Sequence, residues 1–150
     1  MGRIAAVDVG TRRIGIAVSD PSGTLARPFA VIQVGRLRSP VRLVVDALDK
    51  LASEDEGGLQ AIVVGLPAHL DGTPSPQTAQ VRAFAADLGG ILDVPIVLQD
   101  ERLSSREAES RLAEREPDWR KRKPQLDAVA AAVILQDYLD SSHQGLRNEE

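Results

Sequence analysis

The chain has 150 residues, a formal net charge of −4 and no cysteine. This length is typical of one domain with one core, and the missing cysteines exclude disulfides, a thiolate zinc site and cysteine catalysis. The negative net charge argues against a protein covered in positive charge, although local basic patches can still bind nucleic acid. No apolar run reaches membrane-spanning length, so we expect a cytoplasmic protein without a membrane partner.

The first part of the chain predicts three strands joined by short turns. Residues 3–9 (RIAAVDV) and 13–19 (RIGIAVS) form a predicted hairpin, and a third strand fits residues 27–34. Ser39 and Pro40 then occupy the N-cap and the first position of a predicted helix, because serine caps helices and proline is favoured at their start.

The second part of the chain alternates strands with helices. Residues 59–67 (LQAIVVGLP) are a continuous apolar run, which indicates a strand buried on both faces. A helix with an apolar stripe follows a long polar loop, and residues 94–102 (VPIVLQDER) read as the last strand. A capping-box pattern at residues 104–107 starts a short helix that ends before Pro117.

The final predicted helix carries apolar residues at helical spacing, including Leu126, Val133 and Ile134. The order of elements is therefore β-β-β-α-β-α-β-α-α. Three leading strands with short turns predict antiparallel pairing, and strands joined through helices predict parallel pairing. We expect an α/β fold with a mixed five-stranded sheet and helices on both faces. We expect one domain over residues 1–140 and a polar tail over 141–150.

Acidic residues fall at the ends of three predicted elements. Asp8 ends the first strand, Asp100 and Glu101 end the last strand, and Asp127 lies in the first turn of the last helix. Open α/β sheets place their sites beyond the carboxyl ends of strands. Because side chains alternate along a strand, only one of the adjacent pair can face such a site, and we favour Glu101.

Clustered carboxylates without histidine or cysteine suit hard divalent ions such as Mg²⁺ or Mn²⁺, which can activate water for phosphodiester cleavage. Each acid also has a structural interpretation. Asp8 could bond the backbone of its turn, Glu101 could pair with Arg102 at the surface, and Asp127 could favour the positive end of the helix dipole.

Four segments of the chain together resemble the YqgF family, which belongs to the RNase H-like nucleases near the RuvC Holliday junction resolvases. They are DVGTRRIGIAVSD (8–20), GLPAHLDGTPSPQTAQVRAFAADL (65–88), QDERLSSREAESRL (99–112) and KPQLDAVAAAVILQDYLD (123–140). The resemblance implies an RNase H-like fold and a metal-dependent nuclease that matures the 5′ end of pre-16S ribosomal RNA.

The resemblance also assigns residues to the site. Asp8, Glu101 and Asp127 match the acids of the family and would bind Mg²⁺ or Mn²⁺. Related nucleases often use a fourth acid, for which Asp100 and Asp71 are the candidates.

Eight residues are candidates for contacts with a nucleic-acid backbone. Glycine allows close approach, and hydroxyl, arginine and lysine side chains bond phosphate oxygens. Solvated arginines in a hairpin turn, surface ion pairs and a solvated basic face are the structural alternatives. The candidates are Gly10, Thr11, Arg12, Arg13, Arg102, Arg106, Lys121 and Lys123.

Other functions remain open at this stage. The segment 8–20 also resembles the first phosphate hairpin of actin-like ATPases and sugar kinases, but such proteins need a second domain that 150 residues do not supply. A non-catalytic RNA-binding assembly factor and a Holliday junction resolvase remain alternatives. Pre-ribosomal RNA or branched DNA could be the partner, and the protein could be a monomer or a homodimer.

Overall fold

The structure is a computed structural model. It describes residues 2–35, 39–54, 56–67, 71–101, 110, 112–118, 121 and 125–148, with side chains described as far as residue 141.

Five strands form one mixed sheet in the order β3-β2-β1-β4-β5. The first three strands pair antiparallel, and β4 and β5 are added in parallel, as the sequence predicts. The strand β1 is therefore central, with β2 on one side and β4 on the other. The bounds are β1 Arg3–Val9, β2 Arg13–Ser19, β3 Ala26–Gln33, β4 Leu59–Leu66 and β5 Ile96–Asp100.

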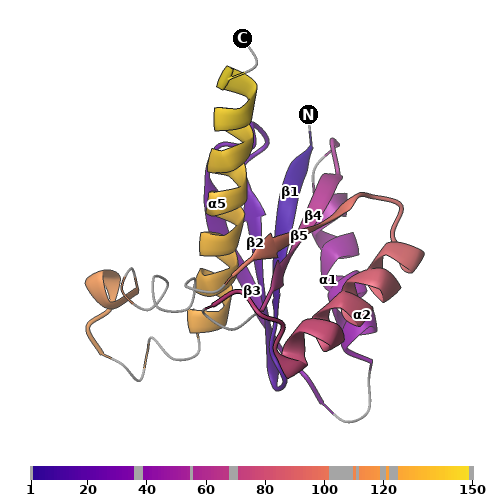
Figure 1. Cartoon of the computed structure of the whole chain (residues 1–150). Coiled ribbons are helices and arrows are strands. Elements are labelled where there is room, and N and C mark those ends of the chain that lie inside the picture. The colour runs from indigo at the N-terminus through magenta and orange to yellow at the C-terminus, as the bar shows by residue number, and fades with distance from the viewer. Residues whose placement is uncertain are drawn as a thin grey trace.

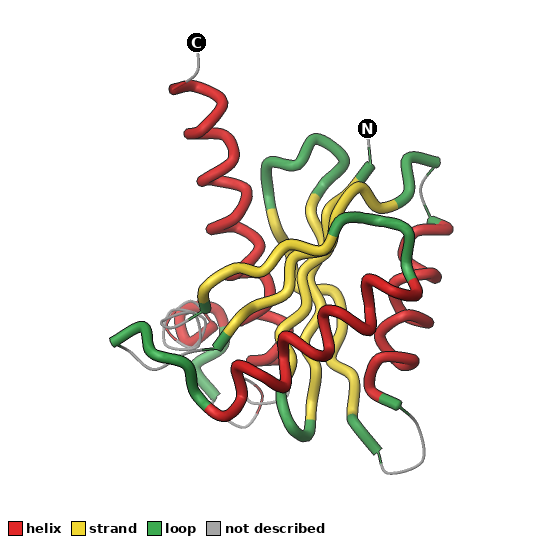
Figure 2. Tube along the Cα trace, turned by 45° about the vertical axis from the view of Figure 1, so that its right-hand side comes forward, coloured by secondary structure: helices red, strands yellow, loops and turns green. Residues whose placement is uncertain are grey.

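Helices cover both faces of the sheet (Figure 1). The helices α1 (Pro40–Ser53) and α2 (Pro76–Ile91) lie on one face, and the long helix α5 (Leu126–Asn148) crosses the other. Figure 2 shows the same three layers after a rotation of the molecule. The helix α5 includes most of the polar segment over 141–150 that the sequence predicts as a tail.

Alternation of side chains along the strands divides the core in two. On β1, Val7 points toward α1 and α2 in the larger core, whereas its neighbour Ala6 points toward α5 in the smaller one. Small residues dominate the sheet on the α5 side, where Ala6 and Ala17 pack with Ala131. The small side chains let the backbone of α5 approach the sheet closely.

The predicted elements agree with the structure to within a few residues at most ends. The third strand covers 26–33 instead of 27–34, and the last strand covers 96–100 instead of 94–102. Pro95 lacks the N–H that a ladder needs, which explains the later start of β5. The predicted short helix after Ser104 lies mostly outside the described residues, but residues 112–115 are helical and Leu112 is buried.

Two features anchor the long loop before α2. The Ser75 amide donates to Thr78 Oγ1 over 2.8 Å, and the Thr78 hydroxyl donates to the carbonyl oxygen of Pro67 over 2.6 Å. The start of α2 is thereby tied to the end of β4. None of the helices in the described part of the chain is long and apolar enough to cross a membrane.

Candidate active site

Asp8 lies near the carboxyl end of the central strand, where neighbouring strands fix its backbone on both sides. It pairs across the antiparallel ladder with Gly15 of β2, and the preceding residue, Val7, pairs with Val64 of β4. The backbone of Asp8 cannot shift without breaking these ladders. The fold therefore presents Asp8 rigidly and keeps it partly buried.

Glu101 meets Asp8 from the end of β5. The Glu101 amide donates to the Leu66 carbonyl over 3.3 Å, which extends the β4–β5 ladder by one residue. Its carboxyl group shares a side-chain hydrogen bond with Asp8. The structure thus places Glu101 at Asp8, while Asp100 adds its negative charge to the surroundings of Glu101.

Asp127 approaches the same cluster from the first turn of α5. Its negative charge acts on Asp8. Its Oδ2 atom accepts a hydrogen bond from Arg13 Nε over 2.8 Å, and the two side chains are 27% and 37% exposed. Three acids from β1, the end of β5 and α5 are therefore brought together, with Arg13 as a counter-ion of the third.

Burial and mutual repulsion keep a proton in this cluster. Burial raises the pKa of Asp8, the hydrogen bond with Glu101 opposes the rise, and the charge of Asp127 adds to it. Burial, the charge of Asp8 and the hydrogen bond raise the pKa of Glu101 to about 9, and the charge of Asp100 adds to the rise. At neutral pH the Glu101 carboxyl therefore keeps its proton and donates a hydrogen bond to the Asp8 carboxylate.

Two glycines create the space in which the acids meet. A Cβ on Gly15 would overlap the carbonyl oxygen of Asp127, and a Cβ on Gly65 would come within 2.7 Å of Glu101 Oε2. Neither glycine is predicted from the sequence to shape the site. The available signal was a glycine in each of two apolar strands, since glycine inside a strand often marks close approach of another group.

The donor set fits a hard divalent cation. The shared proton offsets part of the repulsion between Asp8 and Glu101, as a bound cation would, and all the donors are carboxylate oxygens. Within the described ranges, no group of three or more histidine, cysteine, aspartate or glutamate side chains is arranged so that it could hold a metal ion. In this state Asp127 Oδ2 is bonded to Arg13.

Besides Arg13, the described residues that are predicted to contact phosphate lie in two places. Gly10, Thr11 and Arg12 are exposed in the β1–β2 turn, where the Gly10 amide donates to the Arg13 carbonyl over 2.9 Å. Lys121 is exposed ahead of α5. Arg102, Arg106 and Lys123 lie outside the described residues.

The two candidates for a fourth acid differ in their surroundings. Asp71 accepts hydrogen bonds from the amide and the hydroxyl of Thr73 over 2.9 and 2.7 Å, which is an Asx turn within its own loop. Asp100 acts on Glu101 through its charge. Asp100 therefore has an electrostatic link to the cluster.

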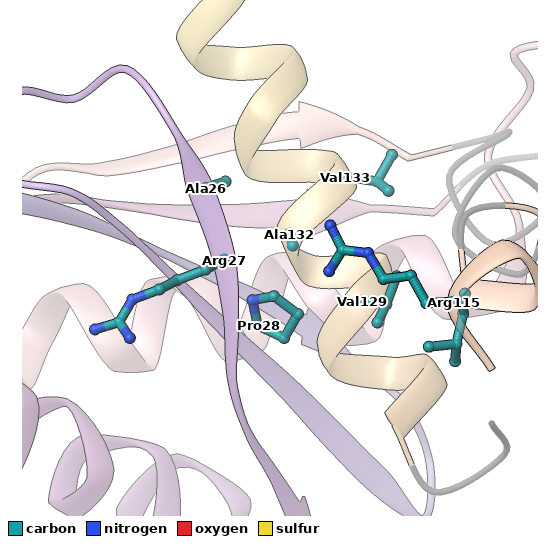
Figure 3. Close-up of a pocket in the computed structure, with 8 residues that line it drawn as sticks. Ala26, Arg27, Pro28, Arg115, Val129, Ala132 and Val133 are labelled. Carbon is teal, nitrogen blue, oxygen red and sulfur yellow. The ribbon is translucent and has the colours of Figure 1, made fainter. Parts of the chain in front are cut away.

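A separate cavity of about 180 Å³ lies between β3, α5 and residues 112–115. Six apolar residues and two arginines line it. Figure 3 shows Arg115 reaching toward α5, whereas the Arg27 side chain points away from it. The lining includes none of the three acids, so this cavity is distinct from the candidate site.

Comparison with known proteins identifies the family of the chain and agrees with the fold. The family model described as RuvX, Holliday junction resolvase, matches residues 2–141. The chain is 39% identical over 139 residues to a protein of Pelotomaculum thermopropionicum named "Putative pre-16S rRNA nuclease", covering 93% of this chain and 87% of that protein. A Thermoanaerobacter pseudethanolicus protein of the same name is 41% identical over 140 residues, covering 93% and 96%.

Solved resolvases share the fold. The fowlpox virus Holliday junction resolvase superposes with a TM-score of 0.57 at 14% identity, covering 93% of this chain and 98% of that one. Thermus thermophilus RuvC in complex with a Holliday junction substrate gives 0.54 at 14% identity, covering 95% and 96%. The expected RNase H-like sheet and the resemblance to the YqgF and RuvC group are confirmed, and the chain belongs to the RuvX family of nucleases, hydrolases of phosphodiester bonds.

Proposed function

We propose that this nuclease depends on a divalent cation and cleaves structured RNA to mature the 5′ end of pre-16S ribosomal RNA in the cytoplasm. The observation that carries the proposal is the convergence of Asp8, Glu101 and Asp127 from three distant parts of the chain. The names of the relatives support the substrate. The oxygen-only donor set supports Mg²⁺ or Mn²⁺ as the cofactor.

Asp8, Glu101 and Asp127 would hold the cation. A divalent ion at such a site supplies Lewis-acid stabilisation of the phosphate and activation of the attacking water. The chain contributes rigid placement, because the sheet fixes Asp8 on both sides and the Leu66 carbonyl anchors Glu101. Fixed donors reduce the reorganisation that the reaction would otherwise require.

Basic and polar groups near the acids would hold the substrate backbone. The exposed turn of Gly10, Thr11 and Arg12 opens beside Asp8, and Lys121 lies just ahead of the helix that carries Asp127. Arg13, Arg102, Arg106 and Lys123 complete the proposed contacts. Phosphate contacts of this kind make binding weaken steeply as salt increases.

A cleavage assay tests the proposal. A pre-16S RNA fragment with its 5′ extension and a four-way DNA junction are incubated with the protein in Mn²⁺, in Mg²⁺ and in EDTA. We expect divalent-dependent cleavage of the RNA by the wild-type protein. Asp8→Asn should remove the cleavage while circular dichroism and the unfolding midpoint show an intact fold. Cleavage that persists in EDTA, or in the Asp8→Asn protein, would refute the proposed chemistry.

Holliday junction cleavage is the second candidate, because the matching family model is described by that activity. A junction resolvase cuts two strands and therefore favours a dimer. Preferential cleavage of the four-way junction, together with a dimeric mass in solution, would favour this function. RNA binding that Asp8→Asn leaves unchanged, with no cleavage by any preparation, would instead indicate a non-catalytic assembly factor.

A further inference from the structure

Arg13 forms an ion pair with one of the proposed cation ligands. Its Nε atom lies 2.8 Å from Asp127 Oδ2, and the pair joins the start of β2 to the first turn of α5. The Arg13 side chain is 37% exposed and the Asp127 side chain is 27% exposed. Water therefore screens this pair less than an ion pair on the open surface.

The position of Asp127 does not depend on Arg13. The backbone of Asp127 packs against Gly15, where no side chain could be accommodated, and Ala131 of the same helix is fully buried against the sheet. Backbone packing thus sets where Asp127 lies. The Arg13 guanidinium forms its ion pair with a carboxylate whose position is already set by the packing of the helix.

Arg13 therefore partly neutralises one member of a cluster of acids that repel one another. The charge of Asp127 disfavours ionisation of Asp8, and a nearby cation reduces the effective charge of Asp127. The Arg13 guanidinium is hydrogen-bonded to Asp127 Oδ2, an oxygen that a divalent ion would use. Its positive charge would also repel that ion.

We infer that Arg13 is the resident counter-ion of Asp127, and that a divalent cation must displace it from that carboxylate in order to bind. This inference rests on the proposed function, since it concerns loading of the same site. Arg13 stabilises the cation-free protein and weakens cation binding. Removing it should tighten Mn²⁺ binding by on the order of tenfold, because one positive charge no longer opposes the ion.

Titration calorimetry and thermal unfolding of the free protein test this inference without a substrate. The proteins compared are wild type, Arg13→Gln and Arg42→Gln, with Mn²⁺ alone as the probe. Arg42→Gln is the matched control: it removes the same charge and breaks an exposed ion pair with Asp46 of 3.8 Å on α1. Arg42 and Asp46 side chains are 64% and 48% exposed.

We expect Arg13→Gln to lower the unfolding temperature in EDTA, to bind Mn²⁺ more tightly, and to show a larger rise in that temperature on adding Mn²⁺. Arg42→Gln should match the wild type in Mn²⁺ affinity. Equal or weaker Mn²⁺ binding by Arg13→Gln, with tight binding by the wild type, would overturn the inference while leaving the proposed function standing.

A more conservative variant, Arg13→Lys, keeps the test possible if Arg13→Gln does not fold. Arg13→Lys keeps the charge but not the planar fork of donors, so its Mn²⁺ affinity should fall between those of the wild type and Arg13→Gln. If the wild-type protein itself binds no Mn²⁺, or if Asp8→Asn binds it equally well, both the proposed cation dependence and this inference are overturned.

Discussion

Gly15 lies directly against the backbone of Asp127, so that a Cβ at residue 15 would overlap the Asp127 carbonyl oxygen and approach the Ala128 nitrogen to 2.8 Å. Backbone atoms cannot rotate away as the end of a long side chain can. The first turn of α5 reaches the sheet because β2 carries a glycine opposite Asp8. The geometry of the acid cluster thus depends on a residue without a functional group.

Gly15→Ala should therefore damage both stability and activity. We expect a loss of about 1–3 kcal/mol in the free energy of unfolding, which is typical of overpacking, and a fall in cleavage rate of on the order of 100-fold from misplacement of Asp127. Urea unfolding and single-turnover cleavage measure the two effects.

Gly90→Ala is the control for this substitution, because residue 90 lies within α2 and a Cβ there meets nothing within 4 Å. Alanine is the better helix former, so this variant should gain about 0.5–1 kcal/mol and cleave normally. A Gly15→Ala protein with the stability and cleavage rate of the wild type would show that α5 can move away from the sheet without disturbing the site.

Gly65→Ala should separate activity from stability. Its Cβ would lie 2.7 Å from Glu101 Oε2 and from Ile134 Cδ1, which are ends of flexible side chains. Because such groups can rotate, the stability cost should be only about 1 kcal/mol. Glu101 would be displaced from Asp8, so cleavage should fall far more than stability does. Parallel measurement of the unfolding midpoint and the cleavage rate checks this, and normal cleavage would contradict the placement of Glu101.

The cation-free protein should lose stability as pH rises. An unfolded glutamate has a pKa of 4.5, whereas Glu101 in the folded protein has a pKa of about 9. Between these values the folded state holds a proton that the unfolded state has released, so the free energy of unfolding falls with pH. The slope should reach at most about 1.4 kcal/mol per pH unit.

Denaturant unfolding in EDTA at pH 5 to 9 measures this slope. Glu101→Gln removes the titrating group and should flatten it. Asp8→Asn should also reduce it, because the charge of Asp8 contributes to the raised pKa of Glu101. An equally steep loss in Glu101→Gln would assign the pH dependence to other groups.

Nucleic-acid affinity should depend on Arg13 only when a divalent cation is present. Without the cation the guanidinium is bonded to Asp127, so Arg13→Gln should change the affinity for an RNA stem little in EDTA. With Ca²⁺ bound, a displaced Arg13 can contact phosphate, and the same substitution should weaken binding by on the order of fivefold to tenfold. Fluorescence anisotropy at fixed ionic strength measures both. Equal weakening in EDTA and Ca²⁺ would contradict the exchange of partners.

Much of the fold could be predicted from the sequence because the signals are local. Alternation, continuous apolar runs and Pro40 at a helix start identify elements that the structure confirms. The adjacency of Asp8 and Glu101 followed from the rule that parallel strands end at the same edge of a sheet. Two contacts of Asp127 could not be predicted in this way.

The contacts of Gly15 with Asp127, and of Arg13 with Asp127, join residues more than a hundred positions apart in the chain. No local pattern encodes how deeply a helix approaches a sheet. The solvated arginine of a hairpin turn and the counter-ion of a partly buried acid look the same in sequence. Only the packing of α5 distinguishes them.

The placement of Asp127 on α5 also sets the order in which the proposed ligands are synthesised. Ribosomes make the β1–β2 hairpin before α5, because synthesis proceeds from the N-terminal side. A nascent chain can form β1, β2 and β3 while the third acid is still unmade. Such a chain has a carboxylate at the end of β1 but no complete ligand set. On the proposed ligand set, the cation site is therefore incomplete until the helix has been synthesised.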